Sequence, residues 1–372
     1  MPYLINPDRN KPWNDLPNVP PPKDKYEDIE ILTQLGNAKA ALGRLQGRSI
    51  VIPNQGMLIN SICLQEAKAS SAIENIFTTD DELYKAFSEK QAEQQGPAKE
   101  VLNYREALWA GHAHLTKNPS FDENYFVKMY RAVCQFKDGI RTPVAQTYIK
   151  QGGTGPNAGK AFYTPPRGKG IIEAKLSNLF DFLNDDIKYP LDPLLKMAIG
   201  HFQFEAIHPF RDGNGRTGRI FNIHYLTHKG LLEYPILFLS RYIMDHKEDY
   251  YAGLAGITQR GDWKNWLLFM IKSVEVTANL TYEKINEIVA AKNAIMEAIV
   301  SETKITRPET LVNALFTQPY TKVIHLSQGG LYAENTARNY LDLLSDMKIL
   351  EKRTIRGSSY YLNLELYRIL SD

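Results

Sequence analysis

Apolar residues return at helical spacing along most of the chain. Over residues 26–45 they recur every three or four positions, which is the spacing of an amphipathic helix. The same periodicity predicts further helices over residues 58–77, 80–90, 100–115, 123–133, 170–184, 191–208, 220–228 and 263–289. Such helices bury their apolar faces against one another, so we expect a mainly α fold.

Two stretches interrupt the helical pattern. Residues 1–25 are rich in proline, which disfavours helix, and they predict an extended arm that either wraps the body or stays disordered. Residues 139–166 are rich in glycine and proline and contain two β-prone runs, 144–149 and 160–164. Two short runs around a glycine-rich turn predict a β-hairpin.

The pattern changes again beyond residue 290. It predicts short helices over 311–316 and 323–326, a longer helix over 334–347, and a hairpin from 349–355 and 360–362. This order resembles a winged helix. Arg338 is the one basic residue in the longer helix, so scaffolding, dimerisation or target docking is favoured over DNA binding. We expect an N-terminal region over residues 1–99, a core over 100–290 and a winged-helix-like domain over 291–372.

Composition narrows the class of protein. The 372 residues carry a net charge of +2, and 43% are hydrophobic, which argues against a generally basic nucleic-acid-binding protein. Cys63 and Cys134 have no metal-binding or redox spacing, so neither a disulfide framework nor a zinc site is expected. The N-terminus does not resemble a signal peptide, and no apolar run reaches the length of a membrane span. A cytoplasmic protein without membrane contact is therefore predicted.

The chemistry gathers in one polar loop between two apolar helical runs. Residues 208–219 read His-Pro-Phe-Arg-Asp-Gly-Asn-Gly-Arg-Thr-Gly-Arg. Its glycines let the backbone approach a ligand, and the start of the following helix offers unpaired N–H groups to an anion. Arg216 and Arg219 lie on one helical face, and arginine suits phosphate oxygens. The loop therefore predicts a phosphate site.

Two further side chains add reactivity to this loop. Asp212 supplies a carboxylate of the kind that holds Mg²⁺ together with substrate phosphates. His208 can exchange a proton near neutral pH. An anion site, a metal carboxylate and a base together predict chemistry on a phosphate bond. The alternative is a glycine-rich turn whose charges only cap a helix.

With every position filled, the loop resembles the signature of the Fic (Fic/Doc) family, H-x-F-x-[DE]-G-N-G-R-x-x-R. The resemblance implies a Fic-fold helical core that transfers AMP from ATP to a Ser, Thr or Tyr hydroxyl of a target protein. It implies that His208 takes the hydroxyl proton, that Asp212 binds Mg²⁺ and that Arg219 binds the γ-phosphate. Asn214 and the backbone of Gly213 and Gly215 would cradle the phosphates. The implied nucleotide site comprises Asp212, Gly213, Asn214, Gly215, Arg216, Thr217, Gly218 and Arg219.

An upstream segment resembles the inhibitory helix of many Fic proteins, which has the pattern [ST]-x-x-x-E-[GN]. Ser70, Glu74 and Asn75 match it, although periodicity alone makes Glu74 an ordinary helix carboxylate. The resemblance implies that Glu74 pairs with Arg219, occupies the place of the γ-phosphate and restricts ATP to an unproductive pose. In some family members the same Glu also supports removal of AMP, so the reverse reaction stays open here.

The resemblance also concerns two neighbouring elements. The hairpin predicted over 139–166 corresponds to a flap that binds the target segment by strand addition; the alternative is a surface hairpin without a role. Tyr250 and Tyr251 follow the signature and are candidates for the adenine end of the pocket, with core packing as the alternative.

Alternatives stay open for the function as a whole. A second hypothesis is a winged-helix DNA-binding regulator whose Fic domain senses nucleotide. A third keeps the fold but uses UTP or another nucleotide as donor. The expected partner is a target protein with a hydroxyl side chain; self-modification and a homodimer stay open, and DNA is disfavoured.

Overall fold

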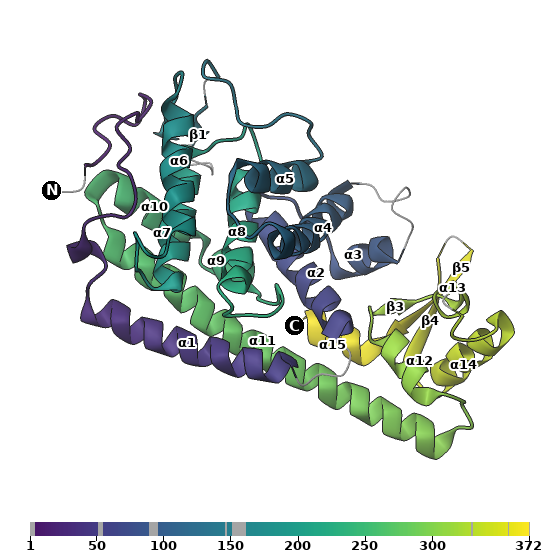
Figure 1. Cartoon of the computed structure of the whole chain (residues 1–372). Helices are drawn as coiled ribbons and strands as arrows, with labels where there is room; N and C mark the ends of the chain where they lie inside the picture. The colour runs from purple at the N-terminus through teal and green to yellow at the C-terminus, as the bar shows by residue number, and fades with distance from the viewer. Residues whose placement is uncertain are drawn as a thin grey trace.

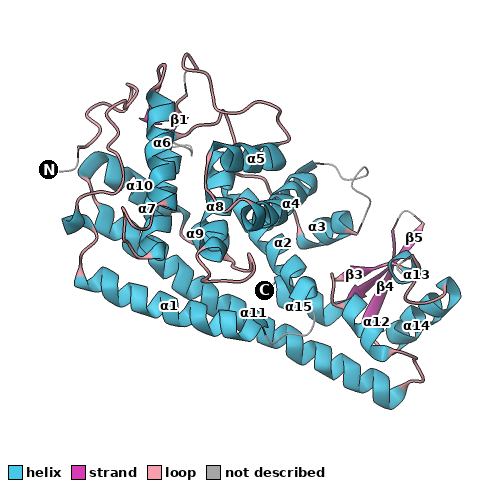
Figure 2. Ribbon diagram, in the orientation of Figure 1, coloured by secondary structure: helices cyan, strands magenta, loops and turns pink. Residues whose placement is uncertain are grey.

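The fold is mainly helical, as the sequence predicts (Figures 1 and 2). The computed structural model describes residues 4–50, 55–88, 96–145, 147–150, 161–328, 330–355 and 357–371. Within these residues the strands form a two-stranded sheet, β1-β2, and a three-stranded sheet, β3-β5-β4. Helices therefore supply most of the core.

Two long helices, α1 and α11, lie side by side along one edge of the molecule (Figure 1). They run in the same direction, since Gln34 donates to Glu275 at 2.6 Å and Arg48 donates to Asn286 at 2.7 Å. α11 continues past residue 289, where the pattern predicted its end, and reaches the C-terminal elements α12 and α15. α1 spans Ile29–Ile50 and α11 spans Trp263–Glu302.

Helix α7 (Pro193–Ile207) is buried along almost its whole length. It begins at Asp192, whose side chain accepts from the Leu194 N–H at 2.9 Å, with proline at the first helical position. Because α7 has almost no polar face, neighbours cover it on several sides. These are α6 (Ile171–Asn184), α8 (Asn214–His228) and α11, and α8 packs in turn on α4 (Gly96–Lys117) and α5 (Glu123–Cys134).

One further long helix, α2, and three shorter ones, α3, α9 and α10, complete this part of the fold. α2 packs on α4 and α9 and brings the predicted inhibitory segment towards the polar loop. α3 begins with a capping box, in which the Glu82 N–H donates to the Thr79 hydroxyl at 3.2 Å and the Thr79 N–H donates to Glu82 at 3.0 Å. The bounds are α2 Gln55–Ile73, α3 Asp80–Phe87, α9 Leu239–Asp245 and α10 Lys247–Arg260.

The N-terminal arm wraps the body, which decides between the two alternatives that the sequence left open. Leu16 is fully buried, and the backbone of Val19 accepts from and donates to the side chain of Asn178 on α6. Gln203 on α7 donates to the Pro17 carbonyl at 3.0 Å. The arm ends in a short 3-10 helix, η1 (Lys23–Lys25), before α1.

The predicted hairpin is confirmed in part. Strands β1 (Ile149–Lys150) and β2 (Ala161–Tyr163) pair antiparallel, with Ile149 opposite Tyr163. The predicted first strand over 144–149 is wrong over most of its length, because Pro143 starts a turn in which Ala145 N–H donates to the Thr142 carbonyl at 3.0 Å. Residue 146 and residues 151–160, with most of the predicted turn, lie outside the described residues.

The C-terminal region has the predicted order of helices and hairpin. Two elements were not predicted: strand β3, which pairs with β5, and helix α15, which returns to α2 and α11. A two-residue strand carries too little periodicity to be recognised in a sequence. The elements are α12 (Pro308–Leu315), β3 (Tyr320–Thr321), α13 (Val323–Ser327), α14 (Glu334–Asp346), β4 (Leu350–Ile355), β5 (Ser358–Asn363) and α15 (Leu364–Ser371).

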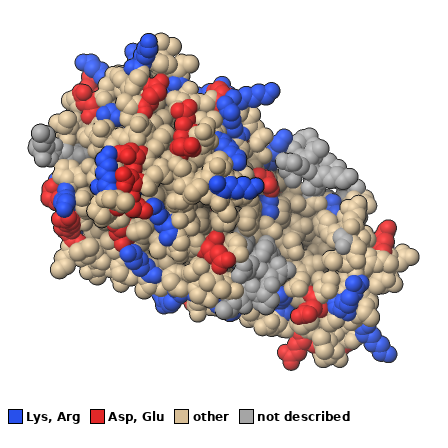
Figure 3. All heavy atoms as spheres, in the orientation of Figure 1, with Lys and Arg blue, Asp and Glu red and all other residues tan. Residues whose placement is uncertain are grey.

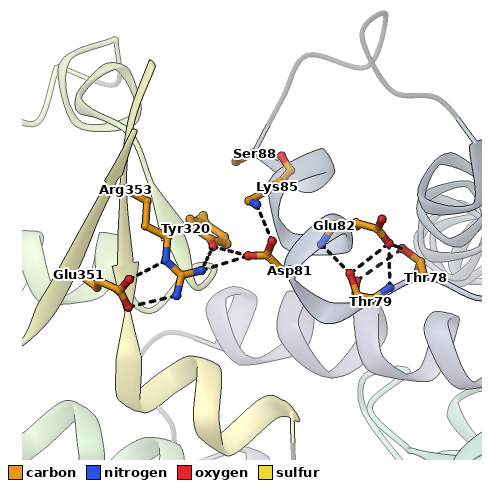
Figure 4. Close-up of polar contacts among 9 residues, drawn as sticks. All are labelled: Thr78, Thr79, Asp81, Glu82, Lys85, Ser88, Tyr320, Glu351 and Arg353. Carbon is orange, nitrogen blue, oxygen red and sulfur yellow. Dashed lines mark hydrogen bonds and ion pairs between the residues drawn. The ribbon is translucent and has the colours of Figure 1, made fainter. Parts of the chain in front are cut away.

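Helix α3 links the N-terminal half of the chain to the C-terminal sheet (Figure 4). Asp81 accepts from the Tyr320 hydroxyl on β3 and from Arg353 on β4, the latter at 3.2 Å. Glu351 accepts from the other side of the Arg353 guanidinium at 2.8 Å. Two regions that are far apart in sequence are therefore joined by one partly exposed polar network.

Charges of both signs are interspersed on the face of the molecule shown in Figure 3. This agrees with the small net charge of the chain, +2. Of the helices in the described ranges, none combines the length and the apolar character needed to cross a membrane.

Candidate active site

His208 lies directly after α7 in an unusual backbone conformation. Its φ of 51° and ψ of 59° are left-handed, which costs a residue with a Cβ about 1–2 kcal/mol. Its N–H donates to the Phe204 carbonyl at 2.9 Å and closes the helix. The imidazole is half-buried and lines a cavity in front of α7.

The loop after His208 is closed by the side chain of Asn214. This amide accepts from the Phe210 N–H and donates to the Phe210 carbonyl, both at 2.9 Å. The Phe210 ring is buried and stacks on Tyr130 with centroids 4.2 Å apart. Because the Asn214 side chain is occupied in this way, a contact of this residue with an anion would use its backbone N–H.

Two glycines leave space where other groups come close. Gly213 has a left-handed φ of 69°, and a Cβ there would lie 2.2 Å from Sγ of Cys134. A Cβ on Gly215 would lie 2.3 Å from a carboxylate oxygen of Glu74. α8 begins at Asn214, so its first N–H groups have no helical partner and can bind an anion.

Arg216 and Asp212 form the outer side of this loop. Arg216 donates to Glu100 at 3.0 Å, and its guanidinium lies 3.9 Å from the Asp212 carboxylate. One oxygen of Asp212 accepts from the Gly213 N–H at 2.7 Å, while its side chain is 65% exposed. Among the described residues no cluster of three His, Cys, Asp or Glu could hold a metal. A single exposed carboxylate next to an anion site fits Mg²⁺ that shares its ligands with substrate phosphates.

Arg219 is buried, and the segment before residue 75 supplies its partners. Its Nε donates to the Ser70 hydroxyl at 2.8 Å, and Nη2 donates to the Ser70 carbonyl at 2.9 Å and to Glu74 at 2.8 Å. Burial alone would raise the pKa of Glu74, but attraction to Arg219, with smaller contributions from Arg216 and Lys247, lowers it. The Glu74 carboxylate is therefore ionised at neutral pH and paired with Arg219.

The end of α2 sets the position of Glu74. The helix stops at Ile73 and not at residue 77 as predicted, because Asn75 has a left-handed φ of 62°. Ile76 N–H then donates back to the Ser71 carbonyl at 3.0 Å, as in a Schellman-type helix end. Lys247 donates to the Ile73 carbonyl. Asparagine at position 75 thus permits the turn that presents Glu74 to Arg219.

A cavity of about 170 Å³ lies between His208, Arg219 and the two short strands, which we call the flap (β1 and β2). Its walls are mostly apolar and aromatic, as is usual for small-molecule sites. Both candidate tyrosines line it; Tyr250 is buried and Tyr251 is partly exposed. The lining residues are Glu74, Ile149, Phe162, Tyr163, Phe202, Glu205, Ala206, His208, Gly215, Arg219, Tyr250, Tyr251, Leu254 and Thr258.

Tyr250 is fixed by His201, a buried histidine of α7. His201 is fully buried, with Nε2 at 2.8 Å from the Tyr250 hydroxyl and Nδ1 at 3.1 Å from the Gly218 carbonyl. The carbonyl can only accept, so Nδ1 carries the proton and Nε2 accepts from Tyr250. Burial lowers the pKa of His201 to about 3, so it stays neutral and serves packing.

Two groups of the cavity have shifted pKa values that keep both uncharged at neutral pH. Burial, with the nearby Arg141 charge, lowers the pKa of His208 to about 4, while the Glu205 carbonyl opposes this shift. Burial raises the pKa of the Glu205 carboxyl to about 8, against the attraction of Arg219. The cavity therefore contains a neutral imidazole that can accept a proton.

Sequence reasoning missed several neighbours of these groups. Glu100, Arg141 and Lys247 lie far from the signature in the chain and carry no local pattern. Glu205 stands one turn before His208 on α7, and that spacing on a helix is the signal that the two residues share a face. Phe162 lies in the predicted hairpin, but its place in the cavity wall, like that of Thr258, had no signal, because it depends on how strands and helices meet.

Three family profiles match the chain. "Fic/DOC family N-terminal" matches residues 32–113, "Fic/DOC family" matches residues 120–226, and "Protein adenylyltransferase SoFic-like, C-terminal domain" matches residues 293–366. The second match contains α7, the polar loop and most of α8.

Curated relatives match a shorter part of the chain. Protein adenylyltransferase fic-1 from Caenorhabditis briggsae and from Caenorhabditis elegans is 30% identical over 115 residues, which is 31% of this chain and 21% of theirs. Protein adenylyltransferase Fic from Culex quinquefasciatus is 30% identical over 115 residues, 31% of this chain and 22% of its own length. The chain thus spans about a fifth of the length of these relatives.

Solved structures show the same fold at low identity. A Fic family protein from Desulfovibrio desulfuricans aligns with a TM-score of 0.57 and 19% identity, over 90% of this chain and 96% of that one. A Fic domain containing signaling protein from Bacteroides thetaiotaomicron aligns with a TM-score of 0.53 and 15% identity, over 67% of this chain and 97% of that one.

Proposed function

Because this chain belongs to the Fic/DOC family, we propose that it is a protein adenylyltransferase that moves AMP from ATP to a Ser, Thr or Tyr hydroxyl of a target protein. One observation carries the proposal: a single cavity has the neutral imidazole of His208 on one wall and the buried guanidinium of Arg219 on another. This pairs a proton acceptor with a phosphate-binding group within one small space.

In the proposed reaction the target hydroxyl gives its proton to His208. The hydroxyl oxygen forms a bond to the α-phosphorus of ATP, the bond from that phosphorus to the bridging oxygen breaks, and pyrophosphate leaves. Arg219, Arg216 and the first N–H groups of α8 bind the negative charge of the phosphates. Mg²⁺, when bound at Asp212, would offset further phosphate charge. The tyrosines at 250 and 251, which line the cavity, are proposed to contact the adenine.

We further propose that Glu74 inhibits this reaction. Its carboxylate accepts from Arg219 at 2.8 Å and stands where a Cβ on Gly215 would collide with it, so it takes both the charge and the space that a γ-phosphate would use. Ser70 accepts from two further donors of Arg219, its Nε and its second Nη2 hydrogen. Hydrolytic removal of AMP, in which water attacks the phosphorus and the protein hydroxyl leaves, is a separate activity to test, and it would need Glu74 in place.

The flap is proposed to bind the target as an added strand. β1 and β2 line the cavity beside His208 through Ile149, Phe162 and Tyr163, and strand addition uses main-chain hydrogen bonds that accept many sequences. DNA binding by the C-terminal region is not proposed, because Lys352 and Arg353 are paired with Asp342 and Glu351.

The test is label transfer from ATP in the presence of Mg²⁺. We expect α-labelled ATP to label protein, and His208→Ala to abolish the label without loss of the folded state. γ-Labelled ATP should leave no label, since the γ-phosphate departs with pyrophosphate. Labelling that survives in His208→Ala, or retained γ-label, would contradict the proposed chemistry. Comparison of ATP, GTP, CTP and UTP would decide the donor.

A further inference from the structure

Arg141 has an unusual set of contacts for an arginine next to an active site. It precedes the flap in sequence, and 7% of its surface is exposed. Its Nε donates to the His208 carbonyl at 2.8 Å, its Nη2 donates to the carbonyls of Pro166 and Ile207, and its backbone N–H donates to the Pro209 carbonyl at 2.8 Å. One residue thus contacts the backbone on both sides of His208.

The same contacts join the two ends of the flap. Arg141 lies before β1 and Pro166 lies after β2, and the hydrogen bond between them fixes the base of the hairpin. A second donor from the flap, the Tyr163 hydroxyl, reaches the Ala206 carbonyl at 2.9 Å. Both flap-side donors therefore end on the last turn of α7, the turn that leads into His208.

The last turn of a helix explains why donors gather there. Its final carbonyls have no partner within the helix, and a cation near them is favoured by the helix dipole. In α7, Tyr163 satisfies Ala206, Arg141 satisfies Ile207, and the His208 N–H satisfies Phe204. Since the left-handed conformation of His208 is costly, these contacts help to maintain it.

We propose that Arg141 is a positioning residue that fixes the flap and the His208 backbone relative to each other, so that a hydroxyl bound along the flap faces the imidazole. This role rests on the adenylyltransfer proposed above. Within the part of the chain that the structure describes, no carboxylate is recorded near the Arg141 charge, and Nε and Nη2 of its guanidinium donate to backbone carbonyls. The side chain does not line the cavity, and we therefore expect it to leave nucleotide affinity unchanged.

The experiment compares Arg141→Gln and Arg141→Lys in a Glu74→Gly parent that is free of the inhibitory carboxylate. Arg131→Gln is the matched control, because Arg131 also donates to a loop carbonyl, that of Asp138 at 2.9 Å, without touching the turn at His208. The measurements are the rate of self-labelling from α-labelled ATP at saturation and the dissociation constant of α,β-methylene-ATP with Mg²⁺. Hydrogen–deuterium exchange is followed over residues 161–166 and 207–209.

We expect Arg141→Gln to lower the labelling rate by about a hundredfold, the effect of a displacement of about 1 Å between reacting groups, with the dissociation constant unchanged. Exchange should rise in both segments, and Arg131→Gln should match the parent. Lysine keeps the charge but lacks the planar fork whose Nε and Nη2 reach separate carbonyls, so we expect Arg141→Lys to restore thermal stability more fully than the labelling rate.

Two results would overturn the assignment: a folded Arg141→Gln that labels at the parental rate, or a loss of nucleotide affinity as large as the loss of rate. If Arg141→Gln fails to fold, a parental rate in Arg141→Lys overturns it equally. If the parent labels nothing, the adenylyltransfer proposal is the one that fails. In that case hydrogen–deuterium exchange alone tests the positioning role. Unchanged protection of residues 161–166 and 207–209 in a folded Arg141→Gln variant would refute it.

Discussion

Replacing Glu74 with glycine is expected to raise the rate of AMP transfer by about thirtyfold. Arg219 is 1% exposed and the Glu74 side chain 35% exposed, with donor and acceptor 2.8 Å apart. A hydrogen bond between charged groups contributes about 1.5–3 kcal/mol when shielded, and the partial exposure of Glu74 argues for a value of about 2 kcal/mol. Since about 1.4 kcal/mol is a factor of ten, freeing Arg219 shifts its availability to a γ-phosphate by about thirtyfold.

The assay is the initial rate of label transfer from α-labelled ATP with Mg²⁺, measured as kcat/KM for ATP. Glu74→Gln separates charge from bulk: the amide keeps the volume next to Gly215 and loses the charge. If Glu74→Gln raises kcat/KM nearly as much as Glu74→Gly does, the charge of Glu74 causes the inhibition. If it raises kcat/KM only slightly, the volume of the side chain causes it. Glu106→Gln is the control, because it removes an Arg–carboxylate pair at the exposed Arg105–Glu106 contact, outside the cavity. An unchanged rate in Glu74→Gly, or an equal gain in the control, would refute the reasoning.

Three other substitutions test further parts of the structure. Glu205→Gln should flatten the dependence of melting temperature on pH between about 4.5 and about 8. The folded wild-type protein keeps the Glu205 proton up to a pKa of about 8, and it loses the resulting stability as the pH rises through this range. An unchanged slope in calorimetry would contradict the burial of this carboxyl. Gly213→Ala should destabilise the fold by about 2 kcal/mol in denaturant unfolding, because its left-handed φ and the Sγ of Cys134 both oppose a Cβ; wild-type stability would mean that the loop relaxes. Asp81→Asn and Arg353→Gln should couple in a double-mutant cycle by about 0.5–1 kcal/mol, and additive effects would show that the two groups act independently.

The sequence predicted the parts of the site that are contiguous in the chain. The polar loop, the capping box at Thr79 and most helices depend on neighbours within one or two turns, so their patterns are visible in the sequence. Glu74 was found only because the segment around it resembles a family pattern, and the structure adds that it lies beyond the end of α2 at Ile73. Periodicity alone would have placed it on an ordinary helix.

What the sequence could not predict depends on tertiary contacts. Arg141 lies 67 positions from His208, and nothing around it distinguishes it from a surface arginine before the chain folds. The first strand of the flap was predicted to begin at residue 144, but residues 144–145 belong to the turn at Pro143 and the strand begins at Ile149. The function of Asn214 was likewise invisible, because its amide is used by the Phe210 backbone.

The short tether between Glu74 and Asp81 has a practical consequence. One end is fixed to Arg219 in the cavity and the other to Arg353 in the C-terminal sheet. Seven residues in extended form reach at most about 25 Å, so the two anchor points cannot separate freely. A truncated protein that ends before Tyr320 would lose the second anchor, and its basal activity would not report the restraint that the C-terminal sheet places on Glu74.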